Sequence, residues 1–209
     1  MQPHAVFIQG AANGVTIADV VSRNGGKFYF IGARGVALVR CDVAGGTTGV
    51  SCHSGSTVTI RDSHLHGASN QQLYVYDASC DVDNSVLEGG DGAIYLSSYS
   101  SVSVAGSVLS GAFAAIGSGG GEYLSVHGSH ILRAGQWAVW ANGPTTGGHR
   151  TYDLTNNYWG TTSAADIAAW IWDSRDSTSN WATVLYEPFS SQEVPTESTS
   201  WGDLKALWR

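Results

Sequence analysis

The chain has 209 residues, a formal net charge of −7, 13% charged residues, 43% hydrophobic residues and 27 glycines. This length and hydrophobic content are enough to bury a core in one elongated domain, and they exclude a disordered chain. Lys and Arg are scattered singly and no stretch approaches about 20 apolar residues, so we expect neither nucleic-acid binding nor a membrane span.

The dominant feature of the sequence is a repeat with a constant step of 22 residues. Its regular copies begin at Val36, Val58, Cys80, Val102 and Leu124. A looser copy begins at Val15, and a late copy begins at Tyr152 after an expected insertion over residues 142–149. In each copy the first and third residues are apolar, the sixth is small, the eighth is apolar, and a glycine usually follows. This alternation predicts a strand with one buried face, then a bend and a second short strand.

Another short alternating strand precedes each copy. These strands are Phe28–Phe30, Val50–Cys52, Leu73–Val75, Ala93–Leu96, Ala115–Gly117 and Ala138–Trp140. Stacking equal turns of chain about 4.8 Å apart would bury the apolar faces in one continuous core. We therefore predict an all-β fold, a single-stranded right-handed parallel β-helix (a solenoid) of about seven coils over residues 1–160. A sandwich of hairpins is the competing fold, but it would not maintain the 22-residue step.

The small sixth position should form an inward ladder of hydrogen bonds along the stack. Its members are Cys41, Ser63, Ser85, Ser107, Ser129 and Asn157. The other cysteines, Cys52 and Cys80, fall on different columns of the repeat. We therefore expect all three cysteines to be small buried fillers rather than a disulfide or metal framework.

Periodicity stops after Gly160, and residues 161–189 are predicted to cap the open end of the solenoid. Ser163 has the spacing of an N-cap for a helix from Ala164 to Trp172. A polar loop over 173–180 and a strand over 182–186 should follow. Residues 190–209 are predicted to be a linker and a short C-terminal amphipathic helix, which either packs on the solenoid or acts as a docking tail.

The run Asn156–Thr161, followed by Val184, Tyr186 and Pro188, resembles the closing segment of bacterial right-handed parallel β-helix repeat proteins. These belong to the pectate-lyase-like superfamily, and the resemblance covers roughly residues 5–190. Because that superfamily includes lyases, hydrolases, esterases, adhesins and phage fibres, the resemblance implies a fold rather than an activity. It also implies an extracellular or cell-surface location, which the low charge content suits.

The catalytic motifs of such enzymes are incomplete here. The segment at Asp91 resembles the double-Asp segment of polygalacturonase-type hydrolases, but Gly92 replaces the second Asp, and Phe113 stands where their His would be. An inverting hydrolase needs paired carboxylates. Register also places Arg61 beside Asp83 on an outward column, which predicts a surface ion pair rather than a calcium or catalytic site. We therefore predict no catalytic residue; the alternative is a polysaccharide lyase or hydrolase with a non-standard site.

Histidines form the other candidate clusters. We expect His64, His66 and Glu88 to lie near one another at a turn edge, where three such groups could bind a transition metal. Solvated turn residues are the favoured interpretation, so we predict no metal and no cofactor. His127 and His130 should point outward, with no evident carboxylate partner.

The candidate binding site is aromatic. The outward position of the preceding strand reads Tyr29, Ser51, Tyr74, Tyr95, Gly117 and Trp140, with His53, Tyr76 and Ser97 in a parallel column. Exposed aromatic patches mark contact surfaces, and flat rings suit the apolar faces of sugars. We therefore predict that Tyr29, His53, Tyr74, Tyr76, Tyr95 and Trp140 bind a ligand. The predicted function is a non-catalytic extracellular or surface module for polysaccharide or partner contact, or for structural display. Two alternatives stay open: the tail or a loop covers this strip, or a homo-oligomer forms through the strip or the C-terminal helix.

Overall fold

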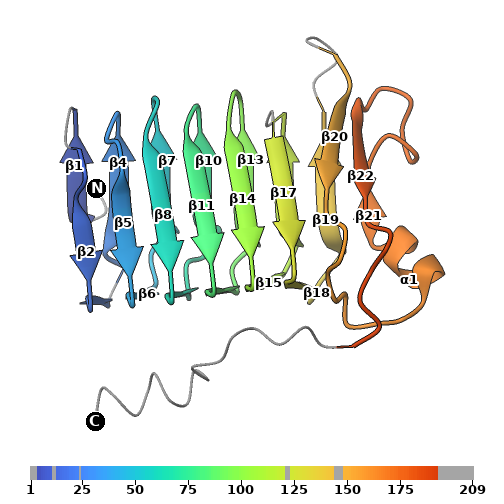
Figure 1. Cartoon of the computed structure of the whole chain (residues 1–209), viewed down its shortest axis with the longest axis horizontal. Coiled ribbons are helices and arrows are strands. Elements are labelled where there is room, and N and C mark those ends of the chain that lie inside the picture. Colours follow the sequence, from blue (N-terminus) through green and yellow to red (C-terminus); the bar gives the residue numbers. More distant parts are fainter. Residues whose placement is uncertain (1–3, 11–12, 24, 121–122, 144–147, 193–209) are drawn as a thin grey trace.

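The chain winds into a parallel β-helix whose coils follow one another along the long axis in sequence order (Figure 1). This computed structural model describes residues 4–10, 13–23, 25–120, 123–143 and 148–192. Strands of successive turns pair in parallel and build three sheets. The predicted C-terminal helix and most of the predicted linker lie outside the described residues.

The first sheet contains one strand from each turn. In order, its strands are β1 (His4–Gln9), β4 (Lys27–Ile31), β7 (Thr48–His53), β10 (Gln71–Tyr76), β13 (Gly92–Ser97), β16 (Ala114–Gly119), β19 (Trp137–Asn142) and β21 (Ile171–Trp172).

The second sheet faces the viewer in Figure 1. Its strands are β2 (Thr16–Ala18), β5 (Val36–Val39), β8 (Thr57–Arg61), β11 (Ser79–Asp83), β14 (Ser101–Ala105), β17 (Tyr123–His127), β20 (Arg150–Asp153) and β22 (Ala182–Leu185).

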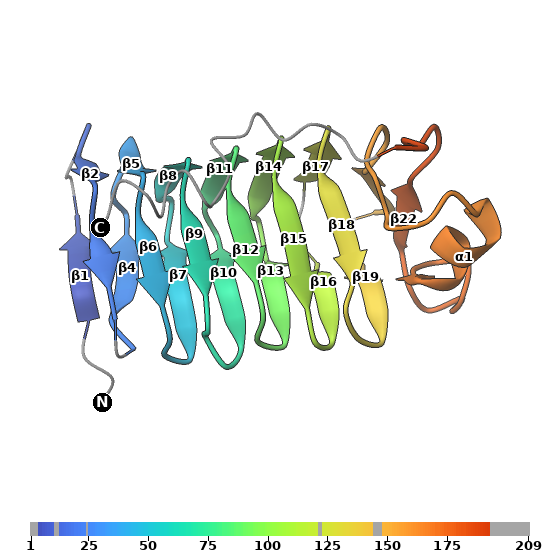
Figure 2. The ribbon, with the colours of Figure 1, turned by 90° about the horizontal axis from the view of Figure 1, so that it is seen from below.

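The third sheet is formed by the short strands after each bend, which lie side by side in Figure 2. They are β3 (Val21–Ser22), β6 (Asp42–Ala44), β9 (His64–His66), β12 (Val86–Glu88), β15 (Val108–Gly111) and β18 (His130–Arg133). Within the described residues, six turns carry all three strands and two partial turns follow. The predicted β-helix is therefore confirmed, with six complete coils in place of about seven.

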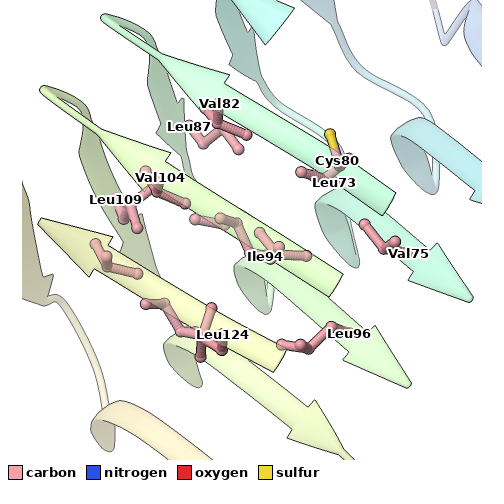
Figure 3. Packing of buried hydrophobic residues seen from close by; sticks show 14 of the residues in the cluster. Leu73, Val75, Cys80, Val82, Leu87, Ile94, Leu96, Val104, Leu109 and Leu124 are labelled. Carbon is pink, nitrogen blue, oxygen red and sulfur yellow. The ribbon is translucent and has the colours of Figure 1, made fainter. Parts of the chain in front are cut away.

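The core consists of apolar side chains that repeat at the same place in every turn. Leu73 lies above Ile94, Val82 above Val104, and Leu87 above Leu109, as Figure 3 shows for this part of the stack. All six are buried. Each coil therefore buries its apolar face only against its neighbours, which is why an isolated copy would not be stable.

The predicted inward ladder is confirmed, and its bonds run from backbone to side chain. The amides of Cys41, Ser63, Ser85 and Ser107 donate to the hydroxyls of Ser63, Ser85, Ser107 and Ser129, at 3.0 to 3.1 Å. Each hydroxyl donates in turn to the carbonyl oxygen two residues before it. Asn157 ends the ladder, because its Oδ1 accepts from the Ser129 amide at 2.9 Å.

The bend explains why a ladder is needed. The residue before each small side chain has a left-handed backbone, with φ of 50° at Asp62 and 44° at Asn84. The backbone turns there from the second sheet to the third, and the next amide bonds to a hydroxyl of the following coil instead of to a strand carbonyl. The three cysteines are free and buried, as predicted.

The C-terminal cap differs from the prediction in one respect. Ser163 caps the helix, accepting from the Asp166 amide at 3.2 Å, but α1 (Ala164–Ala169) ends before Trp172. Ile171 and Trp172 instead form β21, which pairs with β19 and continues the first sheet. The helical spacing of Ile167, Trp170 and Ile171 concealed this strand. The strand predicted over 182–186 is confirmed as β22, and the described residues contain no helical segment with the length and apolar character of a membrane span.

Candidate binding face

The register of the first sheet sets one outward residue from every turn into a single line, here called the aromatic column. Its members are Phe7, Tyr29, Ser51, Tyr74, Tyr95, Gly117, Trp140 and Trp172. The six central positions were predicted from the sequence, and the two ends, Phe7 and Trp172, were not. Phe7 lies one 22-residue step before Tyr29, so the repeat was sufficient to predict its place in the column. Trp172 was hidden in the predicted helix.

The rings of the aromatic column pair between neighbouring coils. Tyr74 and Tyr95 are parallel to within 9°, with centroids 5.9 Å apart. Trp140 stacks on Trp172 at 5.7 Å, and Phe7 on Tyr29 at the same distance. Because coils are about 4.8 Å apart, these centroid distances describe the offset stacking that aromatic rings prefer. The β-sheet thus fixes the position of each ring.

The column is interrupted at two coils where the outward residue is small. A recess of about 280 Å³ lies at Ser51, and Tyr29 and Tyr74 flank it. A second recess, of about 260 Å³, lies at Gly117, between Tyr95 and Trp140. We call them the Ser51 recess and the Gly117 recess. Gln71 lines both, so the two recesses and the Tyr74–Tyr95 pair form one continuous strip.

The Ser51 recess combines aromatic and basic groups. His53 Nε2 lies 2.9 Å from Ser51 Oγ, and its ring is tilted against Tyr29 and Tyr74 at 4.8 and 5.5 Å. Lys27 Nζ lies 4.4 Å above the Tyr29 ring, a cation–π contact. Burial, and secondarily the charge of Lys27, lowers the pKa of His53 below its ordinary value. Burial also lowers the pKa of Lys27.

Tyr76 lies beside the column rather than in it. Its ring is 6.0 Å from His53, and it is among the exposed large side chains of the chain. The structure therefore brings Tyr29, His53, Tyr74 and Tyr76 together at one end of the strip. Tyr95 continues this group through Tyr74, whereas Trp140 lies across the Gly117 recess.

The Gly117 recess contains the segments that resemble hydrolase motifs. Asp91, Gly92 and Phe113 all line it, and the Phe113 amide donates to the Asp91 carbonyl at 2.9 Å. Phe113 meets Trp140 edge to face at 6.0 Å. Among the described residues that line the recess, Asp91 is the one carboxylate. The two segments therefore lie in neighbouring coils, in the predicted register.

Two outward pairs lie on the second sheet. Arg61 Nε is 4.0 Å from Asp83 Oδ2 with both side chains exposed, which confirms a surface ion pair. The expectation that His127 has no carboxylate partner was wrong. Its Nε2 lies 3.6 Å from Asp153 Oδ2, and its Nδ1 lies 2.9 Å from the Thr155 carbonyl oxygen. The insertion before β20 takes Asp153 off the 22-residue step, which concealed the pair.

The interpretation of His64 as a solvated turn residue was also wrong. His64 is 5% exposed, and its Nε2 lies 2.8 Å from Glu88 Oε1. His66 Nε2 lies 2.8 Å from Asp42 Oδ1. Burial is the main cause that lowers the pKa of His64, with a contribution from the neighbouring His66. Asp42, which sequence analysis missed, lies one 22-residue step before His64.

Asp42 also forms an ion pair with the Arg23 guanidinium. Arg23 Nη2 lies 2.6 Å from its Oδ2. Burial alone would raise the pKa of Asp42, but hydrogen bonds from Arg23 and His66 outweigh it and hold the pKa below its ordinary value.

Comparison with protein-family models identifies the family of the chain. The sequence model of the family described as "Right handed beta helix region" matches residues 1–146, which is more than half of the chain. No curated protein and no solved structure matches the chain.

Proposed function

Because the chain belongs to the right-handed β-helix family, we propose that its solenoid is a non-catalytic binding module, located outside the cell or at its surface. We propose further that the aromatic column binds a polysaccharide. The observation that carries this proposal is the parallel Tyr74–Tyr95 pair between two recesses on one rigid sheet. A β-helix that only displays other domains would need no such strip.

The strip suits an extended carbohydrate for a physical reason. Sugar rings present apolar C–H faces to aromatic rings and hydroxyl groups to polar side chains. The polar groups of the Ser51 recess include Lys27, His53 and Ser51, and those of the Gly117 recess are Gln71 and Asp91. Each recess therefore offers both kinds of contact, and the Tyr74–Tyr95 pair lies between them. The net charge of −7 favours a neutral polysaccharide over a polyanionic one.

The carboxylate content of the strip supports binding rather than hydrolysis. Most glycoside hydrolases use two carboxyl groups that flank the glycosidic bond. Asp91 is the one carboxylate among the described residues that line the two recesses. The substitution of Gly92 and Phe113 for the hydrolase residues supports the same conclusion.

A glycan array followed by calorimetry tests the proposal. We expect the chain to bind neutral polysaccharides, and Tyr74→Ala and Tyr95→Ala each to weaken binding by about tenfold. Tyr123→Ala is the matched control, because Tyr123 is an exposed aromatic on the second sheet. Equal effects of the three variants, or no binding by the wild-type chain, would contradict the proposal.

Two further measurements separate the alternatives. Release of shorter or unsaturated sugars from the bound polysaccharide would show an enzyme instead of a binding module. Sedimentation of the chain at several concentrations measures self-association. A dimer that Tyr74→Ala dissociates would show that the strip is an interface between two copies of the chain.

A further inference from the structure

A second cluster of polar side chains lies on the third sheet, where β6 and β9 pair in parallel. Asp42 and His64 are register partners in neighbouring coils, and His66 follows His64 on the same strand. Alternate residues of a strand point to the same face, and the intervening Leu65 is buried in the core. The two imidazoles therefore project together on the outer face, and Asp42 lies beside them.

We propose that Asp42, His64 and His66 form a binding site for a divalent first-row transition-metal ion, with Zn²⁺ as the expected occupant. One ligand atom from each residue lies within 4.8 Å of the others. Zinc bonds to imidazole nitrogen and carboxylate oxygen are about 2.0–2.2 Å long, so small side-chain rotations close the site around one ion. This proposal replaces the sequence-based expectation of no metal and does not depend on the polysaccharide proposal.

The donor set selects the class of metal. Two imidazole nitrogens and one carboxylate oxygen suit Zn²⁺, Co²⁺, Ni²⁺ and Cu²⁺, whereas Ca²⁺ and Mg²⁺ prefer oxygen ligands alone. Glu88 is available as a fourth ligand, because its Oε1 lies 2.8 Å from His64 Nε2. Its side chain is half exposed and can turn toward an ion.

The surrounding structure holds the three ligands in place. The His64 and His66 rings are stacked at 4.1 Å and 11°, and β9 is hydrogen-bonded between β6 and β12. Arg23 contacts Asp42 through Oδ2, which leaves Oδ1 directed at His66. For Asp42, this arrangement matches the general rule that a second group orients a metal ligand.

The cluster is also accessible. A shallow hollow of about 410 Å³ lies beside it, lined by His66, Glu88 and the glycine turn at Gly67, Gly89 and Gly90. An ion can enter from this side, and a water molecule could complete its coordination there. A fully enclosed cluster would not offer that open position.

Metal titration of the untagged full chain, first stripped with EDTA, tests the site. We expect calorimetry to show one Zn²⁺ per chain, Co²⁺ to give the visible absorption of a low-symmetry site, and Zn²⁺ to raise the unfolding temperature. His66→Gln and Asp42→Asn should each weaken Zn²⁺ binding by at least about tenfold. His130→Gln is the matched control, because His130 lies in the same sheet and in the column of Asp42 and His64.

Circular dichroism shows whether each variant folds. If Asp42→Asn does not fold, His66→Gln decides the result, because the His66 side chain is more exposed than that of Asp42. The proposal is overturned if the folded wild-type chain shows no saturable binding of Zn²⁺, Co²⁺ or Ni²⁺. It is equally overturned if His66→Gln binds Zn²⁺ as tightly as His130→Gln does.

Discussion

The Tyr95 ring lies directly over the backbone of Gly117 in the next coil. A Cβ atom at position 117 would come within 2.8 Å of Tyr95 Cδ2, and Gly119 similarly lies beneath the Tyr95 hydroxyl. The absence of a side chain at Gly117 thus does two things. It opens the recess beside Trp140, and it lets the Tyr95 ring lie in its stacked position against Tyr74.

Gly117→Ala should therefore act through Tyr95. The new methyl group displaces the ring and narrows the recess, so we expect polysaccharide affinity to fall by about tenfold while stability falls by about 1 kcal/mol. Calorimetry and urea unfolding measure the two effects. In a Tyr95→Ala background the same substitution should change affinity little, because the ring that it displaces is gone. A full additional loss in that background would show that Gly117 acts independently of Tyr95.

The inward ladder gives a prediction about stability. Ser85 Oγ accepts from the Ser63 amide and donates to the Asp83 carbonyl, and both bonds are buried or partly buried. Ser85→Ala leaves that amide without an acceptor, so we expect a loss of about 1–3 kcal/mol in the free energy of unfolding. Ser103→Ala, which changes an outward-facing serine of β14, should cost less than about 0.5 kcal/mol. Equal costs in urea unfolding would show that the ladder contributes no specific stability.

The cap depends on a buried carboxylate. Asp173 is 0% exposed, and its oxygens accept from the Arg175 guanidinium and from the Val184 amide of β22. Asp173→Asn removes the charge that balances Arg175, so we expect a loss of about 2 kcal/mol. Faster hydrogen exchange of the β22 amides would locate the loss at the cap. Unchanged exchange there, as expected for the exposed control Glu187→Gln, would contradict this role of Asp173.

His53 should make stability depend on pH. Its pKa in the folded chain is lowered below the ordinary value of 6.5. At pH values between this lowered pKa and 6.5, His53 binds a proton in the unfolded chain but not in the folded chain. Stability is then complete above pH 6.5 and decreases as pH falls toward the lowered pKa. Urea unfolding in EDTA across this range should show a shallower decrease for His53→Gln than for the wild-type chain. Parallel pH profiles would remove His53 as a cause.

The sequence determined most of the solenoid because turns of nearly equal length place each residue next to the residue about 22 positions later, in the neighbouring coil. That rule predicted the inward ladder through Ser85 and the register of Asp91 with Phe113. The alternation within the preceding strands placed Tyr74 beside Tyr95, which lies 21 residues later. The rule applies wherever the step is unbroken. Beyond the insertion over 142–149 the step fails, which is why the His127–Asp153 pair and the Trp140–Trp172 stack could not be predicted.

Only the tertiary structure decided which residues meet where the 22-residue step fails, or where contacts run diagonally between coils. Trp172 joins the aromatic column because the chain after α1 returns to the first sheet as β21. Asp42 contacts His66 diagonally between neighbouring coils, and the buried His64 stacks on His66 and contacts Glu88. Repeat spacing gives neighbours along the stack, but diagonal contacts and depth of burial depend on how sharply the backbone bends, and local sequence patterns do not encode that angle.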